Sequence, residues 1–113
     1  MKKIEAVIKP FKLPKVNEAL HDLGISGMTV LEVRGFGRQR GQDGLLNDQN
    51  NADEFRDKVK IEIIVENENS NNAIKAIQKA AYSGKIGDGK IFISNIDQVI
   101  RIRTGEKGNE AIG

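Results

Sequence analysis

The densest cluster of glycine and lysine lies at residues 83–90, which read SGKIGDGK. Glycines let backbone N–H groups approach an anion closely, and the two lysines add positive charge. A plain turn would need one or two glycines, whereas this segment has three glycines and two lysines. We therefore interpret it as a phosphate-binding loop. A P-loop of the nucleotide triphosphatases is excluded, because Ile91 replaces the Ser or Thr that binds magnesium and the next residues are typical of a strand.

Two arginines near the end of the chain, Arg101 and Arg103, form a second candidate for phosphate binding. They alternate with isoleucines, so both would project from one face of a strand. The guanidinium group binds phosphate through two parallel hydrogen bonds, and paired arginines are a common phosphate clamp. The alternative is a pair of solvated surface charges, which is the usual state of arginine.

Other kinds of chemistry have weaker support in the sequence. Residues 34–37 (RGFG) match the first half of an RNA-recognition signature, but the aromatics of its second half are missing. The single histidine, His21, has no nucleophile or metal-ligand cluster spaced with it, and we expect it at the surface. Ligand binding is therefore favoured over catalysis and over RNA binding.

Length and composition are typical of one small domain over residues 1–113. The chain has a net charge of +2, which is too small to indicate a nucleic-acid partner. It has no cysteine, so disulfides and thiolate chemistry are excluded. No apolar run approaches the roughly 20 residues of a membrane helix, and the first residues do not resemble a signal peptide. We expect a soluble cytoplasmic protein without direct membrane insertion.

Hydrophobic periodicity predicts an α+β domain with the order β-α-β-β-α-β, the ferredoxin-like arrangement. Alternating apolar residues predict strands over 4–8, 29–36, 59–65, 90–94 and 99–103. Helical spacing predicts one helix over 13–23, with Pro14 in its first turn and Gly24 as its stop. A second helix is predicted around residues 73–81, with Ser70 as its N-cap and Gly84 ending the run.

A long loop is predicted between the second and third strands, at about residues 37–57. This segment has no sustained period, and loops above about 12–15 residues are uncommon unless they are functional or disordered. The alternative is a tolerated insertion without a role. We expect a functional loop, because segments with glycine and basic residues flank it. A short tail follows at about residues 104–113.

Five segments together resemble the PII signal-transduction family over nearly the whole chain. They are residues 2–13 (KKIEAVIKPFKL), 24–39 (GISGMTVLEVRGFGRQ), 58–65 (KVKIEIIV), 84–92 (GKIGDGKIF) and 99–106 (VIRIRTGE). The resemblance implies a ferredoxin-like homotrimer that binds ATP or ADP in clefts between subunits. It also implies that 2-oxoglutarate binds together with Mg-ATP, and that the long loop then grips or releases a regulated protein in nitrogen and energy signalling.

The resemblance also assigns residues to these ligands. The implied nucleotide site comprises Thr29, Gly35, Gly37, Arg38, Gln39, Glu62, Ile64, Gly87, Asp88, Gly89, Lys90, Arg101 and Arg103. Residues 87–90 and Arg38 would surround the phosphates, Arg101 and Arg103 would come from the neighbouring subunit, and Thr29, Glu62 and Ile64 would line the adenine and ribose pocket. Lys9, Gln39 and Lys58 match positions associated with 2-oxoglutarate, and Gln39 also matches the magnesium position.

The departures from the family pattern concentrate in the long loop. Asn51 replaces the modified tyrosine, Gln49 the phosphorylated serine, and Asn47 the arginine that plugs ammonium channels in relatives. We therefore expect regulation through ligand occupancy alone. The pair Leu45 and Leu46 is our candidate for contact with a regulated protein, which could be a transporter, its ATPase or an enzyme; the alternative is a disordered loop.

Two alternative functions stay open at this point. The first is an ADP/ATP energy sensor that controls a transporter other than the ammonium channel and does not sense 2-oxoglutarate. The second is a slow ATPase, because bound Mg-ATP can be hydrolysed at a low rate. We expect the chain to act by binding and not as an enzyme.

Overall fold

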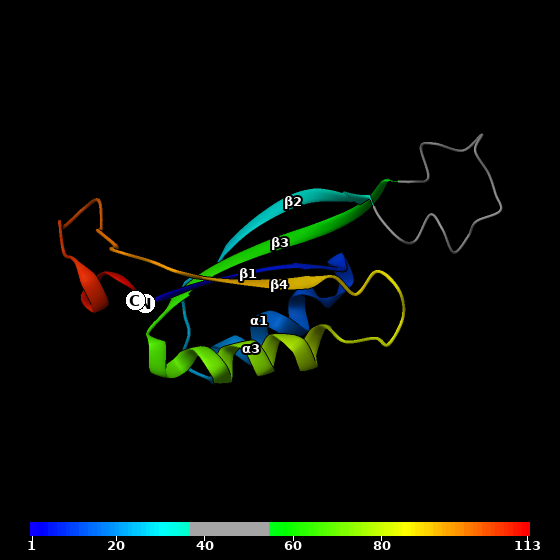
Figure 1. The fold of residues 1–113 in the computed structure, drawn as a ribbon, viewed down its shortest axis with the longest axis horizontal. Coiled ribbons are helices and arrows are strands. Elements are labelled where there is room, and N and C mark those ends of the chain that lie inside the picture. Colours follow the sequence, from blue (N-terminus) through cyan, green and yellow to red (C-terminus); the bar gives the residue numbers. More distant parts are fainter. Residues whose placement is uncertain (37–54) are drawn as a thin grey trace.

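Four antiparallel strands form one sheet, and two helices cover one of its faces (Figure 1). The computed structural model describes residues 1–36 and 55–113. The strands are β1 (Lys2–Ile8), β2 (Thr29–Phe36), β3 (Phe55–Val65) and β4 (Lys90–Asn95), in the spatial order β2-β3-β1-β4. The helices are α1 (Leu13–Asp22) and α3 (Asn67–Ala81), with short 3-10 helices η1 (Pro10–Lys12) and η4 (Gly108–Ala111). This topology is the predicted ferredoxin-like α+β fold.

Aliphatic side chains fill the space between the sheet and the helices. Every second residue is buried over 4–8 of β1 and over 59–65 of β3, as the alternating sequence pattern predicts. These side chains pack against one stripe of each helix. The core consists of Ile4, Ala6, Ile8, Val16, Leu20, Val59, Ile61, Ile63, Val65, Ala73, Ile77 and Ala81.

The ends of the first helix follow the predicted local signals. Pro14 lies in the first turn of α1, where its missing N–H group has no intrahelical partner to lose. Gly24 follows the helix with φ of 83°, a left-handed conformation that glycine adopts without steric cost. The exposed His21 lies in the last turn of α1, on the surface as predicted.

Three predicted boundaries are wrong. The third strand already begins at Phe55, so residues 55–57 belong to β3 and not to the long loop; residues 37–54 lie outside the described part. The second helix begins at Asn67, and Ser70 is a buried residue of its first turn whose hydroxyl donates to the carbonyl of Asn67. Residues 99–103 form no strand, because they lie beyond the end of β4 and form only a single bridge, Ile100 with Lys107.

The uncovered face of the sheet carries a charged network at its centre. Lys60 of β3 forms an ion pair with Glu5 of β1 at 2.9 Å and with Glu62 at 3.6 Å. Lys3 lies 3.6 Å from Glu62 and 3.9 Å from Glu5. The hydrogen bond from Lys60 lowers the pKa of the Glu5 carboxyl, and the same bond raises the pKa of Lys60.

Replacing Glu5 by Gln should lower the melting temperature at pH 7 by an amount that shrinks in acid. The Glu5 carboxylate has a lowered pKa in the folded state, so its contribution is present above the unfolded value of about 4.3. The contribution is lost as the pH falls through the folded pKa. Thermal melts of both proteins between about pH 7 and pH 3 measure it. Glu32→Gln, an exposed glutamate of β2, is the control; a pH-independent difference for Glu5→Gln would contradict the prediction.

Candidate functional site

The glycine-rich loop joins the end of α3 to the start of the edge strand β4 (Figure 1). It turns sharply through three glycines with positive φ: Gly84 at 82°, Gly87 at 98° and Gly89 at 98°. Such angles favour glycine and bring successive N–H groups to one side of a turn. The chain can form this loop because glycine adopts positive φ without steric cost, and three of its six residues from Gly84 to Gly89 need such angles.

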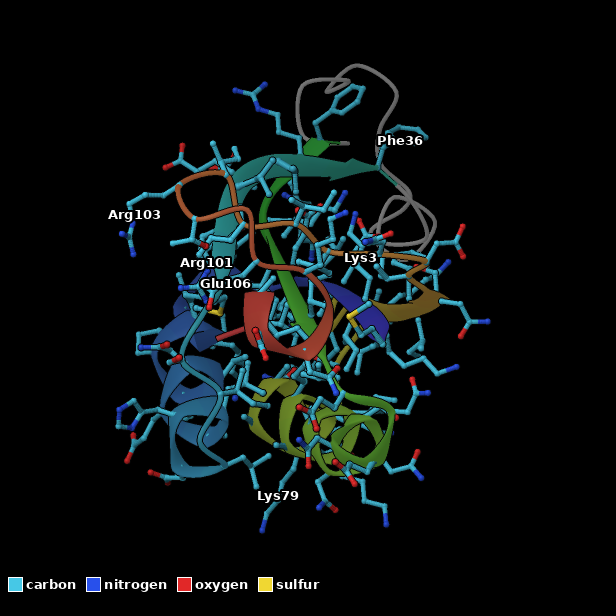
Figure 2. The ribbon with its side chains drawn as sticks, turned by 90° about the vertical axis from the view of Figure 1, so that its left-hand side faces the viewer. Lys3, Phe36, Lys79, Arg101, Arg103 and Glu106 are labelled. Atoms are coloured by element: carbon cyan, nitrogen blue, oxygen red, sulfur yellow. The ribbon has the colours of Figure 1, made fainter. Side chains whose placement is uncertain are left out.

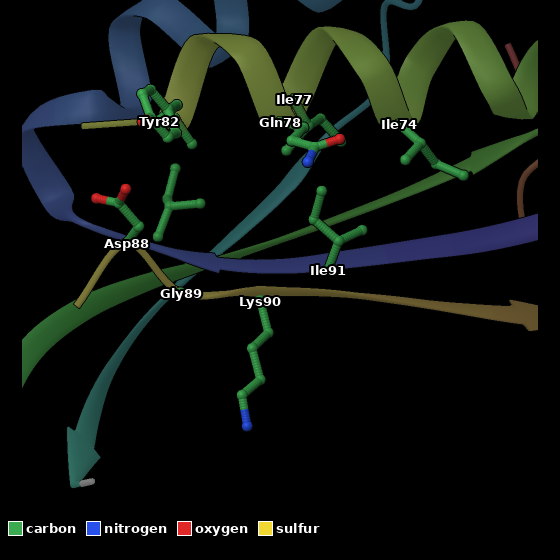
Figure 3. A pocket seen from close by; sticks show the side chains of 10 residues that line it. Ile74, Ile77, Gln78, Tyr82, Asp88, Gly89, Lys90 and Ile91 are labelled. Carbon is green, nitrogen blue, oxygen red and sulfur yellow. The ribbon is translucent and has the colours of Figure 1, made fainter. Parts of the chain in front are cut away.

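Gly89 also lies too close to β1 for any side chain. A Cβ atom built on it would be 1.6 Å from the carbonyl oxygen of Val7. The register agrees, because the next residue, Lys90, pairs with Val7. Lys90 points away from α3, towards the uncovered face of the sheet (Figure 3). The loop and the Lys90 side chain are thus fixed directly to the sheet.

A cavity of about 670 Å³ opens beside the glycine-rich loop. Its walls are the loop itself and the adjoining ends of β1, β2, β3 and β4. The lining residues are Val7, Gly35, Phe36, Lys58, Lys85, Ile86, Gly87, Asp88, Gly89, Lys90 and Phe92. Six of the predicted site residues are therefore brought together here: Gly35, Lys58, Gly87, Asp88, Gly89 and Lys90.

Two lysines connect the glycine-rich loop to the sheet. Lys58 of β3 is 9% exposed and donates from Nζ to the carbonyl oxygen of Gly87 at 2.6 Å. Burial lowers the pKa of Lys58, and repulsion by Lys9 lowers it further. Lys9 follows β1 and lies 3.2 Å from the carboxylate of Asp88, with a hydrogen bond of 2.9 Å to Oγ of Ser83. Both predicted 2-oxoglutarate lysines thus lie at this end of the sheet.

Of the residues in 1–36 and 55–113 that line this cavity, Asp88 is the only acidic one. Partial burial raises its pKa, but hydrogen bonds from Ser83 and Gly84 and the contact with Lys9 lower it more. The net effect holds the pKa of Asp88 well below its usual range. The carboxylate is therefore ionised at neutral pH, and its charge is balanced by Lys9.

A second, smaller cavity of about 390 Å³ lies on the other side of the loop, between α3 and β4 (Figure 3). Its walls are mainly aliphatic side chains such as Ile74, Ile77 and Ile91. Tyr82, at the end of α3, lies at this cavity and is 68% exposed. A Cβ atom on Gly84 would be 3.0 Å from the Tyr82 hydroxyl, so this ring lies directly beside the glycine-rich loop.

The predicted adenine-pocket residues do not line the cavity beside the loop. Thr29 and Glu62 face each other across β2 and β3. Thr29 is three strands away from β4, about 14 Å across the sheet. Ile64 pairs with Lys3, four residues along β1 from Val7, which is about 13 Å.

The segment that carries the two arginines, residues 99–104, lies at the opposite end of the sheet from the glycine-rich loop (Figure 1). Their segment follows β4, whose last residue, Asn95, pairs with Lys2. Arg103 is exposed and extends away from the ribbon (Figure 2). Arg101 is held by its own chain instead: it lies 3.6 Å from Glu106 and donates to the carbonyl oxygens of Glu110 and Gly113. The expectation that both project from one face of a strand is therefore wrong.

Several predicted residues lie outside the described part of the chain. They are Gly37, Arg38, Gln39, Leu45 and Leu46. Sequence reasoning included Ser83 in the glycine-rich segment but assigned it no ligand, although a hydroxyl five residues before an aspartate in a glycine-rich turn is a usable signal. It also missed Phe36, which stacks on Phe55 with ring centroids 5.2 Å apart, and Val7, for which the sequence contains no signal.

The site has the chemistry of an anion-binding site. Within residues 1–36 and 55–113, no group of three or more His, Cys, Asp or Glu residues could hold a metal ion. The same part of the chain has no helix long and apolar enough to cross a membrane. The site instead contains Lys58, Lys90 and the backbone of a glycine-rich loop, all beside one cavity.

Comparisons with known proteins identify the family to which the chain belongs. A family model described as nitrogen regulatory protein P-II matches residues 1–106. Proteins of that name from Azospirillum brasilense and Rhodospirillum rubrum are 56% and 55% identical over 112 residues, 99% of this chain and 100% of theirs. An Arabidopsis thaliana PII structure bound to citrate matches with a TM-score of 0.81 and 40% identity, covering 98% of this chain and 88% of that one. The chain belongs to the nitrogen regulatory protein P-II family.

Proposed function

We propose that this chain is a PII-type signalling regulator that binds ATP or ADP in clefts between the subunits of a homotrimer. It acts in the cytoplasm by binding and not by catalysis, and controls other proteins through its long loop. The observation that carries the proposal is the glycine-rich loop, whose residues 87–90 line a cavity on the uncovered face of the sheet. Phosphates are the anions that such a loop suits best.

The separation of the predicted site residues supports an assembly of several copies. The glycine-rich loop lies at one end of the sheet, whereas Ile64, Arg101 and Arg103 lie towards the other. One ligand can contact both groups when two copies meet head to tail, the loop of one against the arginine segment of the next. Such contacts close into a ring when the rotation allows it, and a trimer is the ring we propose.

Lys58 and Lys9 support a carboxylate ligand beside the phosphates. Both ammonium groups lie near the cavity, and carboxylates bind cationic donors strongly. The Arabidopsis relative bound to citrate shows that a protein of this fold accepts a polycarboxylate. We therefore propose that 2-oxoglutarate binds here together with ATP and magnesium. The described residues offer no cluster of three or more His, Cys, Asp or Glu side chains for a metal, so magnesium would be held by the ligands and Gln39.

One observation favours the alternative of an ADP/ATP energy sensor without 2-oxoglutarate sensing. Lys58 and Lys9 are already bonded within the chain, to Gly87 and to Asp88 and Ser83. A dicarboxylate would have to displace or share these bonds. In either case the long loop would bind and control the regulated protein, which is a transporter, its ATPase or an enzyme. Leu45 and Leu46 are our proposed contact with that protein.

Calorimetric titration with ATP, ADP and 2-oxoglutarate tests the proposal. Lys90→Ala should weaken ADP and ATP binding by about 10- to 100-fold, because a charged contact to phosphate contributes about 1.5–3 kcal/mol. Lys79→Ala is the control, since Lys79 lies on the helical side far from the sheet's uncovered face (Figure 2). Unchanged affinity in Lys90→Ala would reject the site. Binding of 2-oxoglutarate only with Mg-ATP would favour the nitrogen sensor, and no binding would favour the energy sensor.

A further inference from the structure

An aspartate in a phosphate-binding loop presents an electrostatic problem. Asp88 lies between Gly87 and Gly89, where the N–H groups must meet a negatively charged ligand. Like charges at short distance repel, so a carboxylate directed into the cavity would weaken phosphate binding. The structure shows how this repulsion is avoided.

The Asp88 carboxylate is bonded to the start of its own loop. Its Oδ2 accepts from the N–H of Ser83 at 2.8 Å and from the N–H of Gly84 at 2.9 Å. Its Oδ1 accepts from the hydroxyl of Ser83. Both oxygens are therefore bonded to the residues where the loop leaves α3, and the loop is closed into a ring by one side chain.

Lys9 completes this closure. Its Nζ lies 3.2 Å from Oδ1 of Asp88 and donates to Oγ of Ser83 at 2.9 Å. Lys9 and Asp88 are partly buried, with side chains 15% and 24% exposed. The lysine therefore neutralises the aspartate and attaches the closed loop to the end of β1.

The closed loop still has N–H groups without a hydrogen-bond acceptor. Among the described residues, the N–H groups of Gly87 and Asp88 donate to no oxygen. A turn that carries adjacent free N–H groups is a typical anion-binding feature. The shape of this turn depends on the hydrogen bonds that the Asp88 carboxylate accepts, because few other hydrogen bonds hold residues 84–88 in place.

We propose that the carboxylate of Asp88 positions the loop and does not itself touch the bound phosphate. Together with Ser83 and Lys9 it holds the glycine-rich loop in its phosphate-binding shape before the ligand arrives. This inference rests on the proposed nucleotide site and assigns Asp88 the opposite role from a direct ligand. It also makes Lys9 the counter-ion of Asp88.

The proposal is tested by whether Asp88→Ala weakens or strengthens ADP binding. In the absence of magnesium, Asp88→Ala should bind ADP at least about 10-fold more weakly, because the loop loses the shape that collects its N–H groups. If the carboxylate faced the phosphate, its removal would relieve repulsion and ADP would bind more tightly. Asp97→Ala, an exposed aspartate after β4, is the matched control and should leave ADP affinity unchanged.

Ser83 gives a second and milder test if Asp88→Ala does not fold. Ser83→Ala should weaken ADP binding, whereas Ser83→Thr keeps the hydroxyl and should restore the wild-type affinity. Equal ADP affinity in Ser83→Ala and wild type would overturn the proposal. Wild-type protein that binds no ADP would instead reject the nucleotide site itself.

Amide hydrogen exchange in the ligand-free protein distinguishes failure of the positioning role of Asp88 from failure of the nucleotide site. The N–H groups of Ser83 and Gly84 should exchange slowly in the wild type and rapidly in Asp88→Ala, whether or not any nucleotide binds. Unchanged exchange in the folded variant would overturn the positioning role.

Discussion

Gly89→Ala should destabilise the protein by about 3 kcal/mol and abolish measurable ADP binding. The added Cβ atom would be 1.6 Å from the carbonyl oxygen of Val7, a distance that no packed structure accepts. The opposing atom belongs to the backbone of a central strand, so it cannot rotate away. Either β4 separates from β1 or the loop changes shape, and both move Lys90. Chemical denaturation and calorimetry measure the two effects.

Gly105→Ala is the matched control for this experiment. Gly105 also has a left-handed backbone, with φ of 74°, but a Cβ atom there would have no other atom within 4 Å. It should therefore cost only the conformational strain of alanine, about 1–2 kcal/mol. An equal loss of stability in both variants would mean that the contact with Val7 has no role, and would contradict the prediction.

Mixing two defective chains should restore tight ADP binding. Lys90→Ala removes a charge from the glycine-rich loop, and Arg103→Ala removes one from the opposite end of the sheet; each alone should bind ADP about 10- to 100-fold more weakly. If the two groups meet between neighbouring copies, a mixed trimer has one site with the intact loop of one chain and the intact arginine of the other. After refolding an equal mixture, about a quarter of all sites should be of wild-type affinity.

Each variant refolded alone is the control and should show no tight sites. Native mass spectrometry confirms that mixed trimers have formed. If mixed trimers form and no tight sites appear, then Lys90 and Arg103 do not act together across an interface. If the protein is a monomer at micromolar concentration, the head-to-tail arrangement itself is wrong.

Much of the fold could be predicted because it depends on local patterns. The alternation of Ile4, Ala6 and Ile8 with charged residues identifies β1 and its buried face without any knowledge of its neighbours. Gly24 marks the end of α1 because its φ is positive, a requirement that is local to the turn. The order of elements then leaves few arrangements other than the ferredoxin-like one.

The wrong predictions depend on contacts that a local pattern does not contain. Ile100 and Ile102 alternate like strand residues, but a strand needs a partner, and this segment lies beyond the end of β4. Arg101 is predicted to project beside Arg103 from one face of a strand, but the carbonyl oxygens of residues 110 and 113 accept its hydrogen bonds. Ser70 resembles an N-cap by residue type, but the helix starts three residues earlier.

The part of the candidate site that is local in sequence could be predicted, and the part that depends on distant contacts could not. The sequence predicts an anion-binding loop over residues 84–90, since three glycines and two lysines are clustered there. The positions of Lys58 and Val7 beside this loop depend on strand register, which brings residues about 30 and 80 apart in the chain together. Sequence spacing likewise does not show that Arg103 lies at the other end of the sheet from Lys90.

The place of Tyr82 gives the protein a built-in optical probe. The chain contains one tyrosine and no tryptophan, so its intrinsic fluorescence comes from this single ring. The ring is exposed and lies beside Gly84, at the start of the glycine-rich loop. We therefore expect a change in the loop to alter the fluorescence of the unlabelled protein, so that stopped-flow spectroscopy can measure the rate of ligand entry without any added dye.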